Sequence, residues 1–140
     1  MYRQEVRRRI VPDPDVVDVF RNLRRRGIRV GILSNGTTIE QLDTLMLLDV
    51  LEYVDAFAIS EDFGWLKPDI RLTEVALHDL AARPDRTWMV GDDQKSDGQA
   101  ARGAGMLWVR VGDADGPGDL NIHSVAELGG LIQARRAETA

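Results

Sequence analysis

Short apolar runs alternate with amphipathic stretches along nearly the whole chain. Each run has the length of a buried strand and is followed by turn-forming residues, then by apolar side chains at helical spacing. Helices that connect successive strands place those strands parallel to one another. The pattern therefore predicts an α/β fold with a parallel sheet, its strands at residues 28–33, 56–60, 87–90 and 107–111.

Capping residues mark where the helices between these strands begin. Asp13 followed by Pro14 has the form of an N-cap and a first helical residue, and Thr37 and Ser124 each precede a glutamate at capping-box spacing. Gly27 is placed to end the first helix after a basic last turn. We therefore expect helices over 13–26, from 37, from Pro68, over 96–103 and from 124, with loops over 61–67 and 112–119.

The chain has 140 residues, which suits one compact domain. We expect this domain over 13–136, with an N-terminal segment over 1–12 and a polar tail over 137–140. The sequence contains no cysteine, no apolar run as long as a membrane span and no apolar block near Met1. Disulfides, thiolate zinc sites, cysteine nucleophiles and membrane insertion are therefore not expected, and the expected location is a reducing cytoplasm.

The net charge of −5 is distributed unevenly. Residues 1–29 carry a net charge of +5 and the rest of the chain carries −10. An acidic body argues against nucleic acid as the main partner. The basic start has two interpretations, a docking face or solvated charge that compensates a helix end, and the second is favoured.

The turns after the first and third expected strands carry the residues best suited to chemistry. Ser34-Asn35-Gly36 follows the first strand, Asp92-Asp93 follows the third, and Lys67 precedes a helix. In open α/β sheets, ligands bind beyond the carboxyl ends of the strands. Carboxylates beside a lysine and helix-start amides suit a hard cation such as Mg²⁺ together with a phosphate, whose oxygens the cation and the lysine neutralise.

Three short motifs resemble, in order and spacing, those of the haloacid-dehalogenase-like (HAD) hydrolases. They are VGILSNG, KPD and VGDDQKSD, which are similar to motifs two, three and four of that family. The piece AISEDFGWLKPDIRLTEVAL is similar to the capped, nucleotidase-like and sugar-phosphatase-like branch, and the resemblance covers roughly residues 11–111. It implies a three-layer, Rossmann-like domain and Mg²⁺-dependent hydrolysis of a small phosphorylated substrate.

For the phosphoryl group, the resemblance implies two catalytic side chains and two helping amides. Ser34 would donate a hydrogen bond to the transferring phosphoryl oxygen, together with the backbone N–H groups of Asn35 and Gly36. Lys67 would stabilise the negative charge shared by the phosphoryl group and the nucleophile. The structural alternative makes Ser34 and Asn35 turn formers between strand and helix, and Lys67 a solvated loop charge.

For the metal, the resemblance implies that Asp92 coordinates Mg²⁺ and that Asp97 supports the metal site or its waters. Asp93 stands where the family often has a small polar residue, so its role in the metal site is open. The structural alternative makes all three aspartates turn and N-cap residues. Trp65, beside Lys67, has two interpretations, contact with substrate or cover for the loop, and the second is favoured.

The family's first motif has no convincing copy in this chain. It is a strand that ends in D-x-D-x-T or V, in which the first aspartate attacks phosphorus and the second acts as general acid and base. The only formal match is Asp13-Pro14-Asp15-Val16-Val17. Pro12 interrupts the run before it, and Ile10-Val11 is too short for a buried central strand. We therefore interpret this segment as the start of the first helix.

In the family, the strand with the nucleophile lies at the sheet centre, between the strands that end here at Ser34 and Asp92. The chain is thus expected to be a truncated hydrolase core, with residues 1–12 as the end of a cap helix or a substitute element. A missing central strand leaves unpaired edges and exposed apolar surface on its two neighbours. The gap has three possible outcomes: direct pairing of the neighbours, filling by the N-terminal segment, or filling by another chain such as a homodimer partner. A filler is favoured.

Two functions from different classes follow. The first is an Mg²⁺-dependent phosphomonoester hydrolase core that is inactive alone. The second is a non-catalytic phosphate-binding or interaction protein on the same scaffold. A receiver-type doubly wound domain fits worse, because its acid pair lies early in the chain and its order of helices and strands differs.

Overall fold

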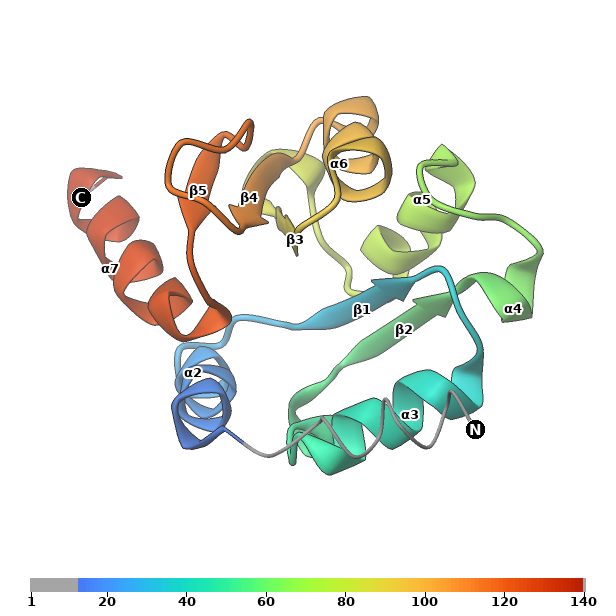
Figure 1. Cartoon of the computed structure of the whole chain (residues 1–140), viewed down its shortest axis with the longest axis horizontal. Coiled ribbons are helices and arrows are strands. Elements are labelled where there is room, and N and C mark those ends of the chain that lie inside the picture. Colours follow the sequence, from blue (N-terminus) through green and yellow to red (C-terminus); the bar gives the residue numbers. More distant parts are fainter. Residues whose placement is uncertain (1–12, 140) are drawn as a thin grey trace.

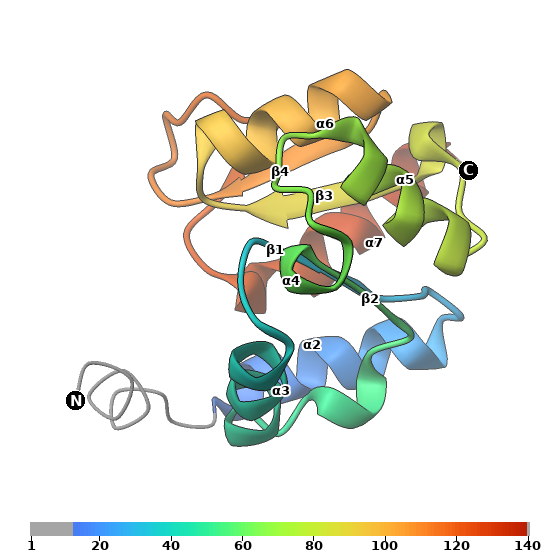
Figure 2. The same cartoon turned by 90° about the vertical axis from the view of Figure 1, so that its right-hand side faces the viewer.

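The computed structural model describes residues 13–139 and shows parallel strands covered by helices on both faces (Figures 1 and 2). Helices α5 and α6 lie on one face, and α2, α3 and α7 lie on the other. The strands are β1 (Gly31–Ser34), β2 (Ala56–Ile59), β3 (Trp88–Gly91), β4 (Leu107–Val111) and β5 (Leu120–Ile122). The helices are α2 (Pro14–Arg25), α3 (Thr38–Leu47), α4 (Ser60–Phe63), α5 (Ile70–Asp79), α6 (Gln99–Ala104) and α7 (Leu128–Thr139). The α/β class with three layers and parallel strands is confirmed.

The caps expected from the sequence form in the structure. Asp13 accepts a hydrogen bond from the backbone N–H of Asp15 at 2.9 Å, so the formal nucleophile motif is the N-cap of α2. Thr37 caps α3 through the N–H of Glu40 at 3.2 Å. Gly27 follows α2 with φ of 72°, a left-handed conformation that favours glycine.

The structure differs from five local expectations. Residues 60–63, expected as the end of a strand and the start of a loop, form the single turn α4, which ends at Gly64 in a left-handed conformation. Helix α5 begins at Ile70, because Asp69 rather than Pro68 supplies the cap. A π-helical turn over Gln94–Gly98 precedes α6. The loop expected over 112–119 is followed by β5, a strand that the sequence pattern missed. Helix α7 continues to Thr139, so most of the expected tail is helical.

The largest core cluster joins α2 and α7 to the sheet that β3, β4 and β5 form. Its buried members come from four elements: Val19 and Leu23 of α2, Val109 of β4, Ile122 of β5 and Leu128 of α7. On the opposite face of this sheet, Trp108 and Met89 pack against the alanines of α6. Among residues 13–139, every helix is too short or too polar to span a lipid bilayer.

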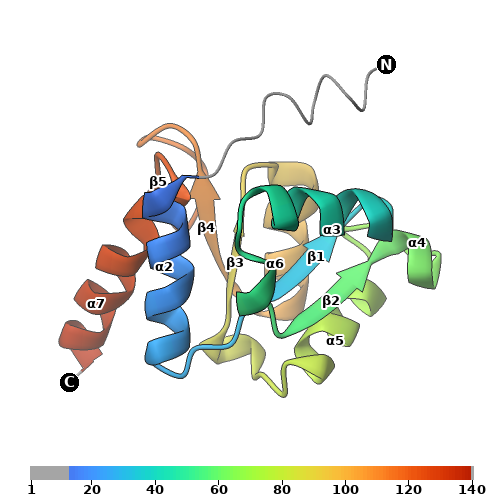
Figure 3. The ribbon, with the colours of Figure 1, turned by 90° about the horizontal axis from the view of Figure 1, so that it is seen from below.

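The strands belong to two separate sheets in the described part of the chain. β1 pairs only with β2, whereas β3 pairs with β4 and β4 with β5, all in parallel (Figure 3). Direct pairing of β1 with β3, one of the three expected outcomes for the gap, is therefore not seen. The interpretation of residues 1–12 as a filler falls outside the described residues.

Burial of the strands agrees with an open position between β1 and β3. All four residues of β1 and three of the four in β3 are only half-buried. β2, which flanks β1 on its outer side, has three of its four residues buried. An inner strand of a continuous parallel sheet is ordinarily covered on both faces and more deeply buried than the outer strands. The edges of β1 and β3 that face one another therefore lack the cover of a neighbouring strand.

Candidate active site

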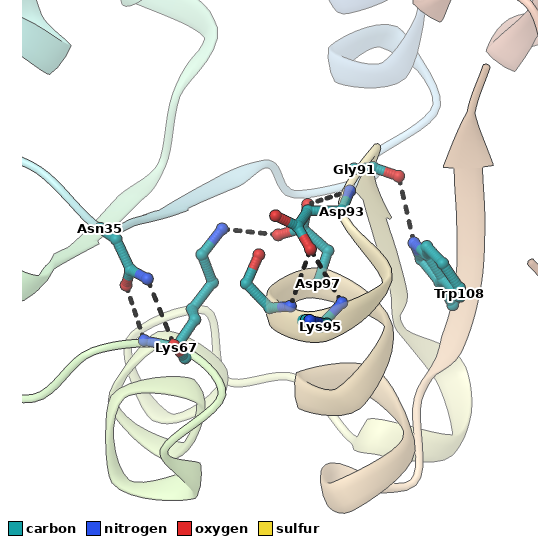
Figure 4. Close-up of polar contacts among 8 residues, drawn as sticks. Asn35, Lys67, Gly91, Asp93, Lys95, Asp97 and Trp108 are labelled. Atoms are coloured by element: carbon teal, nitrogen blue, oxygen red, sulfur yellow. Dashed lines mark hydrogen bonds and ion pairs between the residues drawn. The ribbon is translucent and has the colours of Figure 1, made fainter.

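Lys67 connects the carboxyl ends of the two sheets. Its ammonium lies 2.6 Å from Oδ1 of Asp97, and the two side chains are only 13% and 9% exposed. Lys67 lies in the segment between α4 and α5, which follows β2, whereas Asp97 lies in the π-helical turn that follows β3. The ion pair thus crosses from one sheet to the other (Figure 4).

Asn35, the first residue after β1, holds the main chain of Lys67. The N–H of Lys67 donates to Oδ1 of Asn35 at 2.6 Å, and Nδ2 of Asn35 donates to the carbonyl oxygen of Lys67 at 3.3 Å. The peptide bond from Lys67 to Pro68 is cis. The sequence predicted that the backbone N–H of Asn35 contacts phosphate, and the structure adds a role for the side chain, which holds the main chain of Lys67.

Gly36 is tied to the start of α4. Its backbone N–H donates to Oγ of Ser60 at 3.0 Å, and the Ser60 hydroxyl donates to the carbonyl oxygen of Gly36 at 3.3 Å. Ser60 is buried, and no motif in the sequence marks it as a functional residue. Because the Gly36 amide already has a partner here, the phosphate contact expected of it would have to share or replace that bond.

The turn after β3 has two aspartates with different tasks. Asp93 accepts hydrogen bonds from the backbone N–H groups of Lys95 and Ser96, so it caps the π-helical turn as the structural alternative predicted. Oδ2 of Asp97 accepts from the N–H of Asp93 at 3.2 Å while Oδ1 faces Lys67. Asp97 is therefore fixed by its own loop and by the ammonium together.

Gly91 at the end of β3 and Trp108 in β4 hold this turn in place. A Cβ atom at Gly91 would lie 2.2 Å from Oδ2 of Asp97, so only glycine leaves room for the carboxylate. The indole N–H of Trp108 donates to the carbonyl oxygen of Gly91 at 3.1 Å, and the Trp108 side chain is buried (Figure 4). These contacts hold the end of β3 against β4.

Ser34 and Asp92 are the unengaged groups of the site. Ser34 ends β1 and is half-buried, whereas Asp92 directly follows β3 and is exposed. Within residues 13–139, neither the Ser34 hydroxyl nor the Asp92 carboxylate makes a side-chain hydrogen bond or an ion pair. Both are therefore available to a ligand at the edge where Lys67 and Asp97 meet.

The residues present could contribute only part of an Mg²⁺ site. The described chain contains no cluster of three or more His, Cys, Asp or Glu side chains able to hold a metal ion. Mg²⁺ nevertheless commonly binds through one or two carboxylates, completed by waters and substrate phosphate oxygens. Asp92 suits that role because its carboxylate is free, while Asp97 is shared with Lys67 and Asp93 is used as a cap.

Trp65 covers the loop beside the site. Its ring stacks on Phe63 with centroids 6.0 Å apart, and the guanidinium of Arg71 lies 4.8 Å from its ring centroid. Arg71 also forms two hydrogen bonds to the Asp69 carboxylate, which, with the backbone N–H of Arg71, lower the pKa of Asp69 to about 2. This cluster fixes the start of α5 next to Lys67.

Comparison with known proteins gives the site a context. The family model described as haloacid dehalogenase-like hydrolase matches residues 1–111. The chain is 36% identical over 100 residues to a glyceraldehyde 3-phosphate phosphatase of Methanothermobacter thermautotrophicus, which covers 71% of this chain and 44% of the relative. It is 31% identical over 128 residues to a phosphoserine phosphatase of Thermus thermophilus, which covers 87% of this chain and 51% of the relative.

A solved structure shows the same fold. The crystal structure of a HAD phosphatase from Thermococcus onnurineus superposes with a TM-score of 0.77 at 27% identity, over 86% of this chain and 57% of that one. The chain thus spans about half the length of the proteins that it matches.

Proposed function

Because the chain belongs to the haloacid dehalogenase-like hydrolase family, we propose that it forms the carboxyl-terminal part of the core domain of an Mg²⁺-dependent phosphatase. The position of Lys67 is the observation that carries this proposal. Its main chain is held by the turn after β1 and its ammonium by the turn after β3. A phosphate bound at that ammonium would lie between the unengaged Ser34 and Asp92.

Each of these residues has a task suited to phosphoryl chemistry. The Ser34 hydroxyl orients the phosphoryl group by donating a hydrogen bond to one of its oxygens. The Lys67 ammonium, which also forms an ion pair with Asp97, stabilises the negative charge that gathers on those oxygens. Asp92 would hold Mg²⁺ together with phosphate oxygens and waters, and the ion when bound supplies further neutralising charge.

We propose that the nucleophilic aspartate comes from a strand between β1 and β3. The unpaired facing edges and the half-burial of both strands support such a strand. It would come from a segment encoded upstream of Met1 or from another polypeptide, a second copy of this chain included. Asp13 is a poor substitute because its side chain caps α2. We therefore expect the isolated chain to bind phosphate but not to hydrolyse phosphomonoesters.

The proposed substrate is a small phosphorylated molecule. The relatives named glyceraldehyde 3-phosphate phosphatase and phosphoserine phosphatase support this size class for the present chain. The cytoplasmic location expected from the sequence stays a prediction.

Calorimetric titration of the chain with inorganic phosphate in the presence of Mg²⁺ tests the proposal. We expect weak binding that is lost in Asp92→Asn. Asp85→Asn is the matched control, since Asp85 lies before β3 at the opposite end of that strand, and it should bind phosphate as the wild type does. Equal binding by Asp92→Asn and the wild type would contradict the assigned metal ligand. Turnover of p-nitrophenyl phosphate that disappears in Asp13→Asn would restore the rejected motif.

The DNA upstream of Met1 separates the enzyme from a binding protein. An in-frame strand followed by D-x-D-x-T and a helical segment supports a fragment of an active hydrolase. An in-frame stop codon supports the phosphate-binding protein, provided that the chain binds phosphate and does not hydrolyse phosphomonoesters even at concentrations at which two copies of it associate.

A further inference from the structure

The Asn35 side chain satisfies both main-chain polar groups of one residue that lies 32 positions away. It accepts from the Lys67 N–H at 2.6 Å and donates to the Lys67 carbonyl oxygen at 3.3 Å. Two antiparallel hydrogen bonds from a planar carboxamide fix both the position and the rotation of the peptide that they hold. These bonds fix the main chain of Lys67 relative to the end of β1, although Lys67 itself lies in an irregular segment.

The far end of the Lys67 side chain depends on this placement. A lysine has a flexible four-carbon stem, and its ammonium can occupy many positions unless both ends are held. Here the ammonium reaches Asp97 at 2.6 Å on the other sheet. We propose that Asn35 is a positioning residue for Lys67, whose carboxamide sets the main chain so that the ammonium reaches the space between the carboxyl ends of β1 and β3.

A neighbouring set of contacts provides the competing explanation. Ser60 forms two hydrogen bonds with Gly36, so it also ties the turn after β1 to the segment that follows β2. Ser60 lies seven residues before Lys67, however, and the left-handed Gly64 lies between them. The Ser60 bonds therefore fix the start of α4, while those of Asn35 fix Lys67 itself. Ser60→Ala is the matched control, because it removes two bonds between the same segments and spares those of Asn35.

Hydrogen exchange of the Lys67 amide, measured by NMR, tests the positioning without any ligand. In Asn35→Ala the amide should exchange at least about tenfold faster than in the wild type, because its acceptor is gone. In Asn35→Asp, which keeps an acceptor oxygen, the amide should stay protected, and in Ser60→Ala it should stay protected as well. Unchanged protection in Asn35→Ala in a folded protein, shown by its circular dichroism, overturns the proposal.

Phosphate affinity shows whether Asn35 acts through Lys67, a step that rests on the proposed function. With inorganic phosphate and Mg²⁺, Asn35→Ala should weaken binding about tenfold in the wild-type background and have no further effect in Lys67→Met. An equal loss in both backgrounds means that Asn35 contacts the phosphate itself, which overturns the positioning role. Should the wild type bind no phosphate, the proposed function fails, whereas amide exchange still decides whether Asn35 positions Lys67.

Discussion

Breaking the ion pair between Lys67 and Asp97 should destabilise the fold far more than breaking an exposed pair does. The two side chains are 13% and 9% exposed and their charged atoms are 2.6 Å apart. Removing one partner of a buried pair leaves the other charge desolvated and typically costs about 3–5 kcal/mol. Because the Lys67 side chain keeps 13% of its surface exposed, we expect the lower end, about 3 kcal/mol, for Asp97→Asn. For a chain of this length, that corresponds to a melting temperature lower by about 6–12 °C.

A double-mutant cycle, followed by urea unfolding, isolates the pair. Lys67→Met should also destabilise, and the double variant should be more stable than the sum of the single effects predicts, by about 2 kcal/mol. Arg83 and Asp85 form the matched control: their atoms are 2.7 Å apart, but the side chains are 72% and 61% exposed, so Asp85→Asn should cost less than about 0.5 kcal/mol. Additive effects at Lys67 and Asp97, or an Asp97→Asn variant as stable as Asp85→Asn, would refute the reasoning.

Two further outcomes follow from the structure. Gly91→Ala should destabilise the fold by about 1–3 kcal/mol and displace Asp97, because the new Cβ would lie 2.2 Å from the Asp97 carboxylate. Gly103→Ala in α6, where the space around the new Cβ is open, should be neutral or stabilising. Equal free energies of unfolding for the two variants would contradict this expectation. The Asp69 carboxyl, with its pKa lowered to about 2 by Arg71, should contribute stability above about pH 4 that is lost as the pH falls towards 2. Arg71→Leu should raise the midpoint of the Asp69 titration followed by NMR. An unchanged midpoint would show that the Arg71 side chain does not lower this pKa.

The sequence pattern located β1 to β4 because each is an apolar run that a local window detects. It missed β5, which has three residues and follows a loop rich in Gly and Asp. That strand depends on its pairing with β4, and the Asp119 carboxylate just before it accepts from the backbone N–H of Trp108 in β4. Within its own turn, Asn121 bonds to both main-chain groups of Gly118. No periodicity encodes such contacts.

The same limit applies to the candidate site. Strand ends predicted that Ser34, Lys67 and Asp92 lie at one edge, because the carboxyl ends of parallel strands meet there, and the family resemblance added Asp97. They did not show that Asp97, rather than Asp92, meets the ammonium, because that depends on the path of the π-helical turn. A glycine before Asp92 was the available signal: its missing Cβ leaves the room that Asp97 occupies.

The split of the sheet and the chemistry of its edge have a common geometric cause. Lys67 belongs to the β1–β2 side and Asp97 to the β3–β5 side, so their ion pair joins the two sheets at the carboxyl end of the open position. A strand inserted there in parallel would pair with both free edges and end beside that ion pair. Its last residues would then meet Ser34 on one flank and Asp92 on the other. Under the proposed function, the nucleophilic carboxylate that the described residues lack would thus arrive beside the Lys67–Asp97 ion pair, between the ends of β1 and β3.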